Sequence, residues 1–126
     1  FRSVEDIYRT NTHSMPYTWI PASKLPYYQA PTILILHGYG DNKSANIFKN
    51  TGWNVLAPKD INGKDGQGSW WLGEKGNTFI VQMIENLVEE FEFAGLINRK
   101  NLYIYGKSMG GFAALMLGPK LRARAV

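Results

Sequence analysis

One apolar run in the chain, residues 32–36, is continuous and lacks the alternation of apolar and polar positions that a half-exposed strand has. Strands buried on both faces have such runs, and they are typical of parallel sheets that helices cover. Residues 53–57 and 101–105 predict two further buried strands. A short strand is also expected at residues 17–20, which are rich in β-forming residues and stop at Pro21.

Helical spacing of apolar residues marks the segment 79–91, and its glutamates lie largely off the apolar stripe. The pattern predicts an amphipathic helix that Asn77 caps and that ends near Gly95. Smaller helices are expected at residues 43–50 and 112–117, the second of them apolar and buried. Strands that alternate with helices indicate an α/β fold, with a mostly parallel sheet and helices on both faces in three layers.

Composition and charge exclude several classes of function. A chain of 126 residues is expected to form one domain, and no apolar run approaches the roughly 20 residues that span a bilayer, so no membrane role is expected. The net charge is +4 but the basic residues are scattered, so no nucleic-acid partner is expected. The absence of cysteine excludes disulfides and thiolate metal sites, and neither a metal nor another cofactor is expected. No signal peptide is visible, and a cytoplasmic location is expected.

Residues 106–110 read Gly-Lys-Ser-Met-Gly and match the Gly-x-Ser-x-Gly pattern of a nucleophile elbow. In such an elbow a tight strand-to-helix turn places the serine oxygen above the sheet, and the flanking glycines leave room for the turn. The helix N-terminus then favours developing negative charge. Because the motif follows a buried run and precedes an apolar helix, Ser108 is predicted to be a nucleophile. The alternative is a glycine-rich turn with an incidental serine.

A His-Gly-Tyr-Gly sequence at residues 37–40 closes the first long buried run, and it resembles the oxyanion loop of α/β hydrolases. Acyl transfer needs two backbone N–H donors aimed at the tetrahedral oxyanion. We expect these donors to come from Tyr39 and from Met109, which directly follows the nucleophile. We expect His37 to organise the loop by hydrogen bonding and not to act as a base.

The long loop at residues 59–76 contains five glycines, and long loops in compact domains are often functional. Trp70 and Trp71 are adjacent in it, and we expect their rings to bind substrate, since tryptophan faces suit sugar rings or aromatic acyl groups. The alternative is a loop that one tryptophan anchors to the core. Two other motifs are rejected: residues 60–71 lack the final glutamate of a calcium loop, and residues 101–106 lack a glycine-rich phosphate loop.

Over roughly residues 17–126 the chain resembles esterase-D-like and feruloyl-esterase-like α/β hydrolases. The two motifs carry the resemblance, because Ser108 follows His37 by 71 positions and these families have a similar spacing. The resemblance implies a serine esterase or acyltransferase that forms a Ser108 acyl-enzyme on a small-molecule or glycan ester. The alternative is a non-catalytic binding module or pseudoenzyme that recognises a glycan or a protein partner.

The triad of this superfamily follows the order Ser, then Asp or Glu, then His, yet no Asp, Glu or His follows Ser108. Residues 123–126 read as a strand that enters a further part of the sheet. Residues 1–126 are therefore interpreted as a single incomplete domain, the N-terminal half through the elbow. A fragment, a second polypeptide that supplies the rest, and a degenerate relative are the three explanations, and we favour the fragment. The chain alone is expected to be inactive, and to self-associate or pair with a complementary half.

Overall fold

The computed structural model describes residues 4–10, 13–22, 29–38, 52–61, 71, 79–107 and 109–126. Within these ranges the chain forms one five-stranded sheet and two α-helices. The strands are β1 (Val4–Arg9), β2 (Ser14–Ile20), β3 (Thr32–Leu36), β4 (Asn54–Pro58) and β5 (Leu102–Gly106), and the helices are α1 (Phe79–Phe93), α2 (Met109–Leu121) and the short 3₁₀ helix η4 (Arg99–Asn101).

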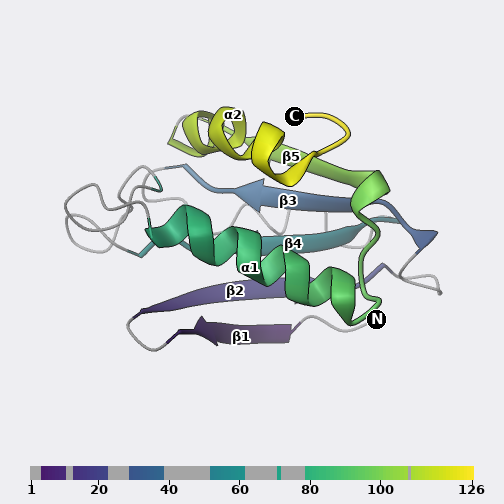
Figure 1. Ribbon diagram of the computed structural model, residues 1–126, viewed down its shortest axis with the longest axis horizontal. Helices are drawn as coiled ribbons and strands as arrows, with labels where there is room; N and C mark the ends of the chain where they lie inside the picture. The colour runs from purple at the N-terminus through teal and green to yellow at the C-terminus, as the bar shows by residue number, and fades with distance from the viewer. Residues whose placement is uncertain are drawn as a thin grey trace.

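The strand order across the sheet is β1-β2-β4-β3-β5 (Figure 1). β3 lies at the centre of the parallel part and pairs with both β4 and β5, whereas β1 and β2 are antiparallel to their neighbours. All five residues of β3 and of β4 are buried. The structure thus confirms the two buried strands expected at residues 32–36 and 53–57, and it confirms the mostly parallel sheet.

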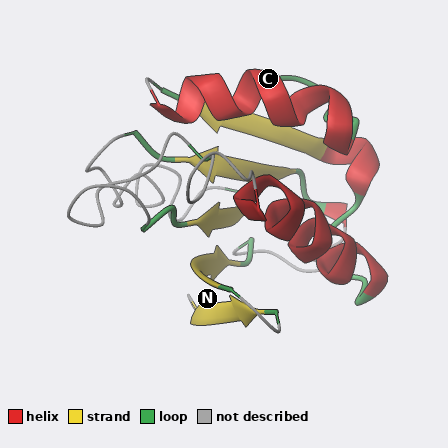
Figure 2. Ribbon diagram, turned by 60° about the vertical axis from the view of Figure 1, so that its left-hand side comes forward, coloured by secondary structure: helices red, strands yellow, loops and turns green. Residues whose placement is uncertain are grey.

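Both described α-helices lie on the same face of the sheet (Figures 1 and 2). They cover a large apolar core to which alternate residues of the strands contribute, among them Leu34, Leu36 and Leu56. The opposite face carries a second, smaller cluster that includes Ile33, Ile35 and Val55. The helix expected at residues 43–50, on which a second helical layer would depend, lies outside the described residues.

α1 confirms the predicted amphipathic helix. Its buried residues recur at helical spacing, and three of its four glutamates are exposed. Phe91 on this stripe packs edge-on against the rings of Tyr17 and Trp19 of β2. The buried positions of α1 are Ile80, Val81, Met83, Ile84, Leu87, Val88 and Phe91. Neither described helix has the length and apolar character that a membrane crossing needs.

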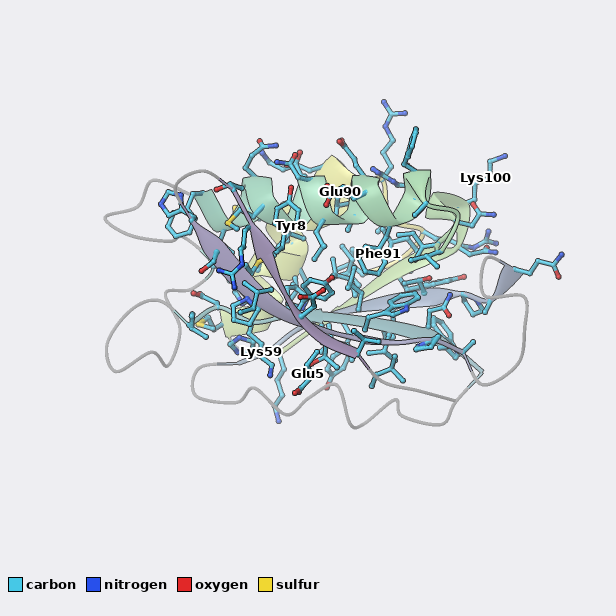
Figure 3. The ribbon with its side chains drawn as sticks, turned by 90° about the horizontal axis from the view of Figure 1, so that it is seen from below. Glu5, Tyr8, Lys59, Glu90, Phe91 and Lys100 are labelled. Atoms are coloured by element: carbon cyan, nitrogen blue, oxygen red, sulfur yellow. The ribbon has the colours of Figure 1, made fainter. Side chains whose placement is uncertain are left out.

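β1 was not expected from the sequence. It pairs with β2 along its whole length, and five of its six residues are exposed. Tyr8, its half-buried residue, lies between β1 and α1 beside Glu90 (Figure 3). Burial raises the pKa of the Tyr8 phenol above its usual value, and the Glu90 carboxylate raises this pKa further.

Two expectations about burial are wrong at the opposite edge. In β5 only Leu102 and Ile104 are buried: they face the main core, whereas the alternating Tyr103 and Tyr105 point to the other face of the sheet and are half-buried and exposed. In α2, Leu115 is 76% exposed and Phe112 is 44% exposed, so the helix is buried on one face only.

The end of the chain continues the sheet for a short distance. Ala125 forms an isolated parallel bridge with Tyr103 of β5. The Arg124 N–H donates to the Leu102 carbonyl at 2.7 Å, and the Ile104 N–H donates to the Ala125 carbonyl at 3.0 Å. This pairing agrees with the strand expected at residues 123–126, although only one bridge of it forms.

Candidate active site

The Gly-Lys-Ser-Met-Gly segment lies where the sheet meets a helix. β5 ends at Gly106 and α2 begins at Met109. A Cβ atom added at Gly106 would overlap the carbonyl of Gly110, in the first turn of α2. The Gly110 N–H donates to the Lys107 carbonyl at 3.0 Å, which closes the turn. Glycine at position 106 is therefore required because the strand and the first turn of the helix approach so closely.

The second glycine of the motif brings this turn against β3. A Cβ atom at Gly110 would overlap the Leu36 carbonyl oxygen and would lie 2.9 Å from the His37 carbonyl oxygen. Leu36 is also the register partner of Gly106 in the parallel β3–β5 pair. The N-terminus of α2 and the chain that leaves β3 are consequently in direct contact.

Three of the five residues predicted for the site, Ser108, Tyr39 and Trp70, lie outside the described residues. Met109 is the first residue of α2 and its side chain is fully buried in the main core. Its position at a helix N-terminus is one at which backbone N–H groups and the helix dipole favour an anion. The described part of the chain thus contains Met109, one of the two proposed oxyanion residues, and Gly38 and Lys107, which directly precede Tyr39 and Ser108.

His37 follows β3 directly, is 5% exposed and uses both nitrogens of its ring. The backbone N–H of Asp60 donates to His37 Nε2 at 2.8 Å. Nε2 is therefore an acceptor, the ring proton is on Nδ1, and Nδ1 donates to the Gly38 carbonyl at 2.8 Å. These bonds agree with the expected organising role of His37 and leave neither ring nitrogen available to deprotonate a serine.

Asp60 links this histidine to Trp71, which lies further along the long loop. It lies two residues beyond β4, is 1% exposed, and its Oδ2 accepts the backbone N–H of Trp71 at 2.8 Å. The Trp71 indole N–H donates to the His37 carbonyl at 3.3 Å, and the two rings lie 4.9 Å apart between their centroids. His37, Asp60 and Trp71 form a buried polar network, which we call the His37–Asp60–Trp71 network.

The ring of Trp71 has no exposed surface. It belongs to the main hydrophobic core, where it is among the largest fully buried side chains. A ring enclosed in this way cannot stack on a substrate in this structure, so the expected substrate-binding role of Trp71 is corrected to that of an anchor for the loop. Of the two adjacent tryptophans, only Trp70 remains a candidate for substrate binding.

The second histidine of the chain, His13, lies next to the turn between β1 and β2. Its ring stacks on that of Phe79 at the start of α1, with 3.7 Å between centroids. β4 and β3 separate β2 from β5 in the sheet. Three strand spacings of about 4.8 Å place β2 about 14 Å from β5. Neither histidine is therefore positioned to act as a base at the end of β5.

Asp60 is the functional candidate that sequence analysis missed, since it was considered only within the rejected calcium loop. A signal was present: Asp60 follows the carboxyl end of β4, just as His37 follows the carboxyl end of its neighbour β3. Ligands of open α/β sheets bind at this edge. Among the described residues, no group of three or more histidine, cysteine, aspartate or glutamate side chains could hold a metal ion.

No family model matches the sequence, and no curated protein is similar to it. Solved structures are similar in fold. The chain superposes on S-formylglutathione hydrolase from Agrobacterium tumefaciens with a TM-score of 0.68 and 17% identity, over 98% of this chain and 54% of that one. It superposes on a capsule O-acetyltransferase of Neisseria meningitidis serogroup A with a TM-score of 0.63 and 17% identity, over 92% of this chain and 46% of that one. For a thermostable carboxyl esterase from Bacillus coagulans the TM-score is 0.60 and the identity 18%, over 92% of this chain and 41% of that one. The chain spans about half the length of these proteins.

Proposed function

We propose, on the premise that the chain has a partial α/β-hydrolase fold, that its protein hydrolyses or transfers acyl esters with Ser108 as nucleophile. The Ser108 Oγ attacks the ester carbonyl and loses its proton to a base, and the carbonyl oxygen becomes an oxyanion. When the tetrahedral intermediate collapses, the alcohol leaves with a proton and the acyl group stays on Ser108. Attack by water then gives hydrolysis, and attack by a second alcohol gives transfer.

The observation that supports this proposal most is the contact of Gly110 with the Leu36 and His37 carbonyls. It holds the N-terminus of α2 against the loop that follows β3, so that N–H donors from both segments can serve one oxyanion. We assign these donors to Met109 and Tyr39. Loss of one such donor typically lowers kcat by about 10²- to 10³-fold.

For the substrate we propose an acetyl or aromatic acyl ester of a carbohydrate. Trp70 is the candidate for contact with the sugar or the aromatic acyl group, because an indole face suits either. The similar structures include both esterases and an O-acetyltransferase. Hydrolysis and transfer differ only in the acceptor, and the proposal includes both.

The acid and the base of the triad are proposed to come from polypeptide outside these 126 residues, since no Asp, Glu or His follows Ser108. A serine hydroxyl without a base is a weak nucleophile. The 126-residue chain alone should therefore have negligible esterase activity towards a simple aryl ester, measured beside Ser108→Ala. Turnover of about 1–10³ per second that disappears in Ser108→Ala would show that the chain contains its own base.

Labelling of the full-length protein with a serine-directed phosphonate tests the proposal. Covalent labelling that Ser108→Ala abolishes supports the enzyme. A folded protein that binds glycans but is not labelled supports the alternative, a binding module with the same fold. Ser69→Ala, which changes a serine in the long loop outside the motif, is the matched control and should leave labelling unchanged.

A further inference from the structure

We infer that Asp60 is a positioning residue for the oxyanion loop and acts through His37 and Trp71, an assignment that rests on the proposed function. Asp60 is buried at the carboxyl edge of the sheet, where β4 ends beside β3. Its backbone N–H donates to His37, in the chain that leaves β3, and its carboxyl group accepts the N–H of Trp71, 11 residues further along the same long loop.

The backbone bond determines the state of the His37 ring. Because the Asp60 N–H donates to Nε2 at 2.8 Å, the ring is neutral and carries its proton on Nδ1. That proton is donated to the Gly38 carbonyl at 2.8 Å. The orientation of the Gly38 carbonyl therefore depends on the position of Asp60.

The orientation of this carbonyl matters for the proposed oxyanion hole. In a trans peptide bond the N–H points away from the carbonyl of the same bond. A Gly38 carbonyl that is held by His37 consequently fixes the direction of the N–H that follows it, which is the donor assigned to Tyr39. Oxyanion donors act because they are oriented before the reaction, so a change of direction reduces their effect.

The carboxyl group of Asp60 holds His37 from a second direction. It accepts the N–H of Trp71, whose φ of 62° lies in the left-handed region that a non-glycine residue seldom adopts. A hydrogen bond to a carboxylate is among the stronger ones and stabilises this conformation. Trp71 in turn donates its indole N–H to the His37 carbonyl and packs its ring against the imidazole. Without the carboxyl group, Trp71 loses the bond that fixes its backbone, and His37 keeps the Asp60 N–H but loses a firm contact with Trp71.

The carboxyl group of Asp60 is buried. Burial of such a group is costly unless hydrogen bonds compensate it, and an apolar residue of similar size avoids the cost. An apolar side chain at position 60 could fill the same space, but it could not accept the Trp71 N–H. We therefore infer that Asp60 contributes by orienting Trp71, and through Trp71 the His37 residue, and not by packing alone.

The test measures kcat and KM of the full-length protein on an aryl ester, with active sites counted by phosphonate titration. Asp60→Ala should lower kcat per active site by about 10- to 100-fold and change KM by less than about 3-fold, since displacement of a catalytic group acts on the transition state. Asp60→Asn keeps an oxygen that accepts the Trp71 N–H, and should restore kcat to within about 3-fold of the wild type.

An unchanged kcat per active site in Asp60→Ala, with only a lower unfolding temperature, would overturn the assignment. If Asp60→Ala does not fold, Trp71→Phe decides instead: it keeps a ring in the core but removes the indole donor, and an unchanged kcat overturns the assignment. Ser108→Ala is measured in parallel. A wild type without Ser108-dependent turnover overturns the proposed function and the assignment together, whereas Ser108-dependent turnover that Asp60→Ala leaves intact overturns the assignment alone.

Discussion

At the scale of single residues, the space around Gly110 leaves no room for a side chain. A Cβ there would overlap a backbone carbonyl of β3, which cannot move without disturbing the centre of the sheet. The next residue, Gly111, differs: its nearest neighbour would be the Gly106 carbonyl oxygen at 3.5 Å, an ordinary van der Waals distance. Two adjacent glycines in the first turn of α2 are thus under different constraints.

Gly110→Ala should lower the free energy of unfolding by about 1–3 kcal/mol, because forcing extra atoms into a packed interior costs this much. Gly111→Ala should leave it unchanged or raise it by up to about 1 kcal/mol, since alanine favours a helix over glycine. Urea denaturation of both variants measures the difference. Equal effects of the two substitutions would contradict the close approach of α2 to β3.

The ring of His37 should be neutral with its proton on Nδ1, because the Asp60 N–H can donate only to an unprotonated Nε2. Two-bond ¹H–¹⁵N NMR spectra distinguish the two neutral tautomers directly. His13→Gln removes the signals of the other histidine and assigns those of His37. A ring protonated on Nε2 would contradict the His37–Asp60–Trp71 network.

The partners of His37 could not be read from the sequence, although His37 itself could. The His-Gly pair at the end of a buried run is a local pattern. Asp60 and Trp71 are 23 and 34 positions away from His37, and their relation depends on which strands become neighbours in the sheet. Adjacent tryptophans in the sequence look equivalent, and only the fold shows that Trp71 is enclosed.

At the scale of elements, the buried strands were predictable and the edge strand was not. β3 and β4 are covered on both faces, so burial imposes continuous apolar runs that the sequence displays. β1 obtains its hydrogen bonds from β2 and leaves most of its residues in water. Exposed residues are under no such compositional constraint, which is why β1 has no recognisable pattern.

The contact of β1 and β2 with α1 should make the stability of the protein sensitive to alkaline pH. Burial raises the pKa of Tyr8 and then the Glu90 carboxylate raises it, and for Tyr17 burial acts first, followed by the Asp6 carboxylate. A pKa that is higher in the folded state means that the folded state holds the proton more tightly. The resulting stability is fully present below the unfolded value of 10.0 and is lost as the pH rises through the folded values.

The free energy of unfolding should accordingly fall as the pH rises above 10.0, and it should fall less in the double variant Tyr8→Phe/Tyr17→Phe. Urea titrations at several pH values measure this, and a Tyr103→Phe variant controls for tyrosine content. An equal loss in the wild type and the double variant would show that other groups, such as the lysines, cause the alkaline destabilisation.

At the scale of the whole molecule, α2, which packs on β5, carries an exposed apolar stripe. Phe112 and Leu115 are three positions apart and share one face of the helix. Gly118 continues this spacing, and Val126 lies against it, since a Cβ at Gly118 would come within 2.6 Å of Val126 Cγ2. Leu115 and Val126 are 76% and 61% exposed. Contiguous apolar surface of this kind marks sites of association.

The 126-residue chain should therefore self-associate through this stripe. Leu115→Lys should shift it towards the monomer, because a charged side chain is costly to bury in a contact. Sedimentation velocity at several concentrations measures the distribution. Phe93→Lys is the control, since Phe93 is 95% exposed at the end of α1, away from the stripe. An equal effect of the two variants, or a wild type that stays monomeric, would contradict this use of the surface.

The pairing of β3 with β5 has a consequence for the order in which the protein folds. Thr32 pairs with Leu102, 70 positions further along the chain. A loop of this length must close before the first turn of α2 can reach Leu36, and such long-range closures are slow compared with the formation of a helix or a hairpin. The hairpin of β1 and β2 and the helix α1 can form earlier from local contacts. We therefore expect the two halves of the proposed oxyanion hole to come together late in folding, and a growing chain cannot bring them together until β5 has been synthesised and has paired with β3.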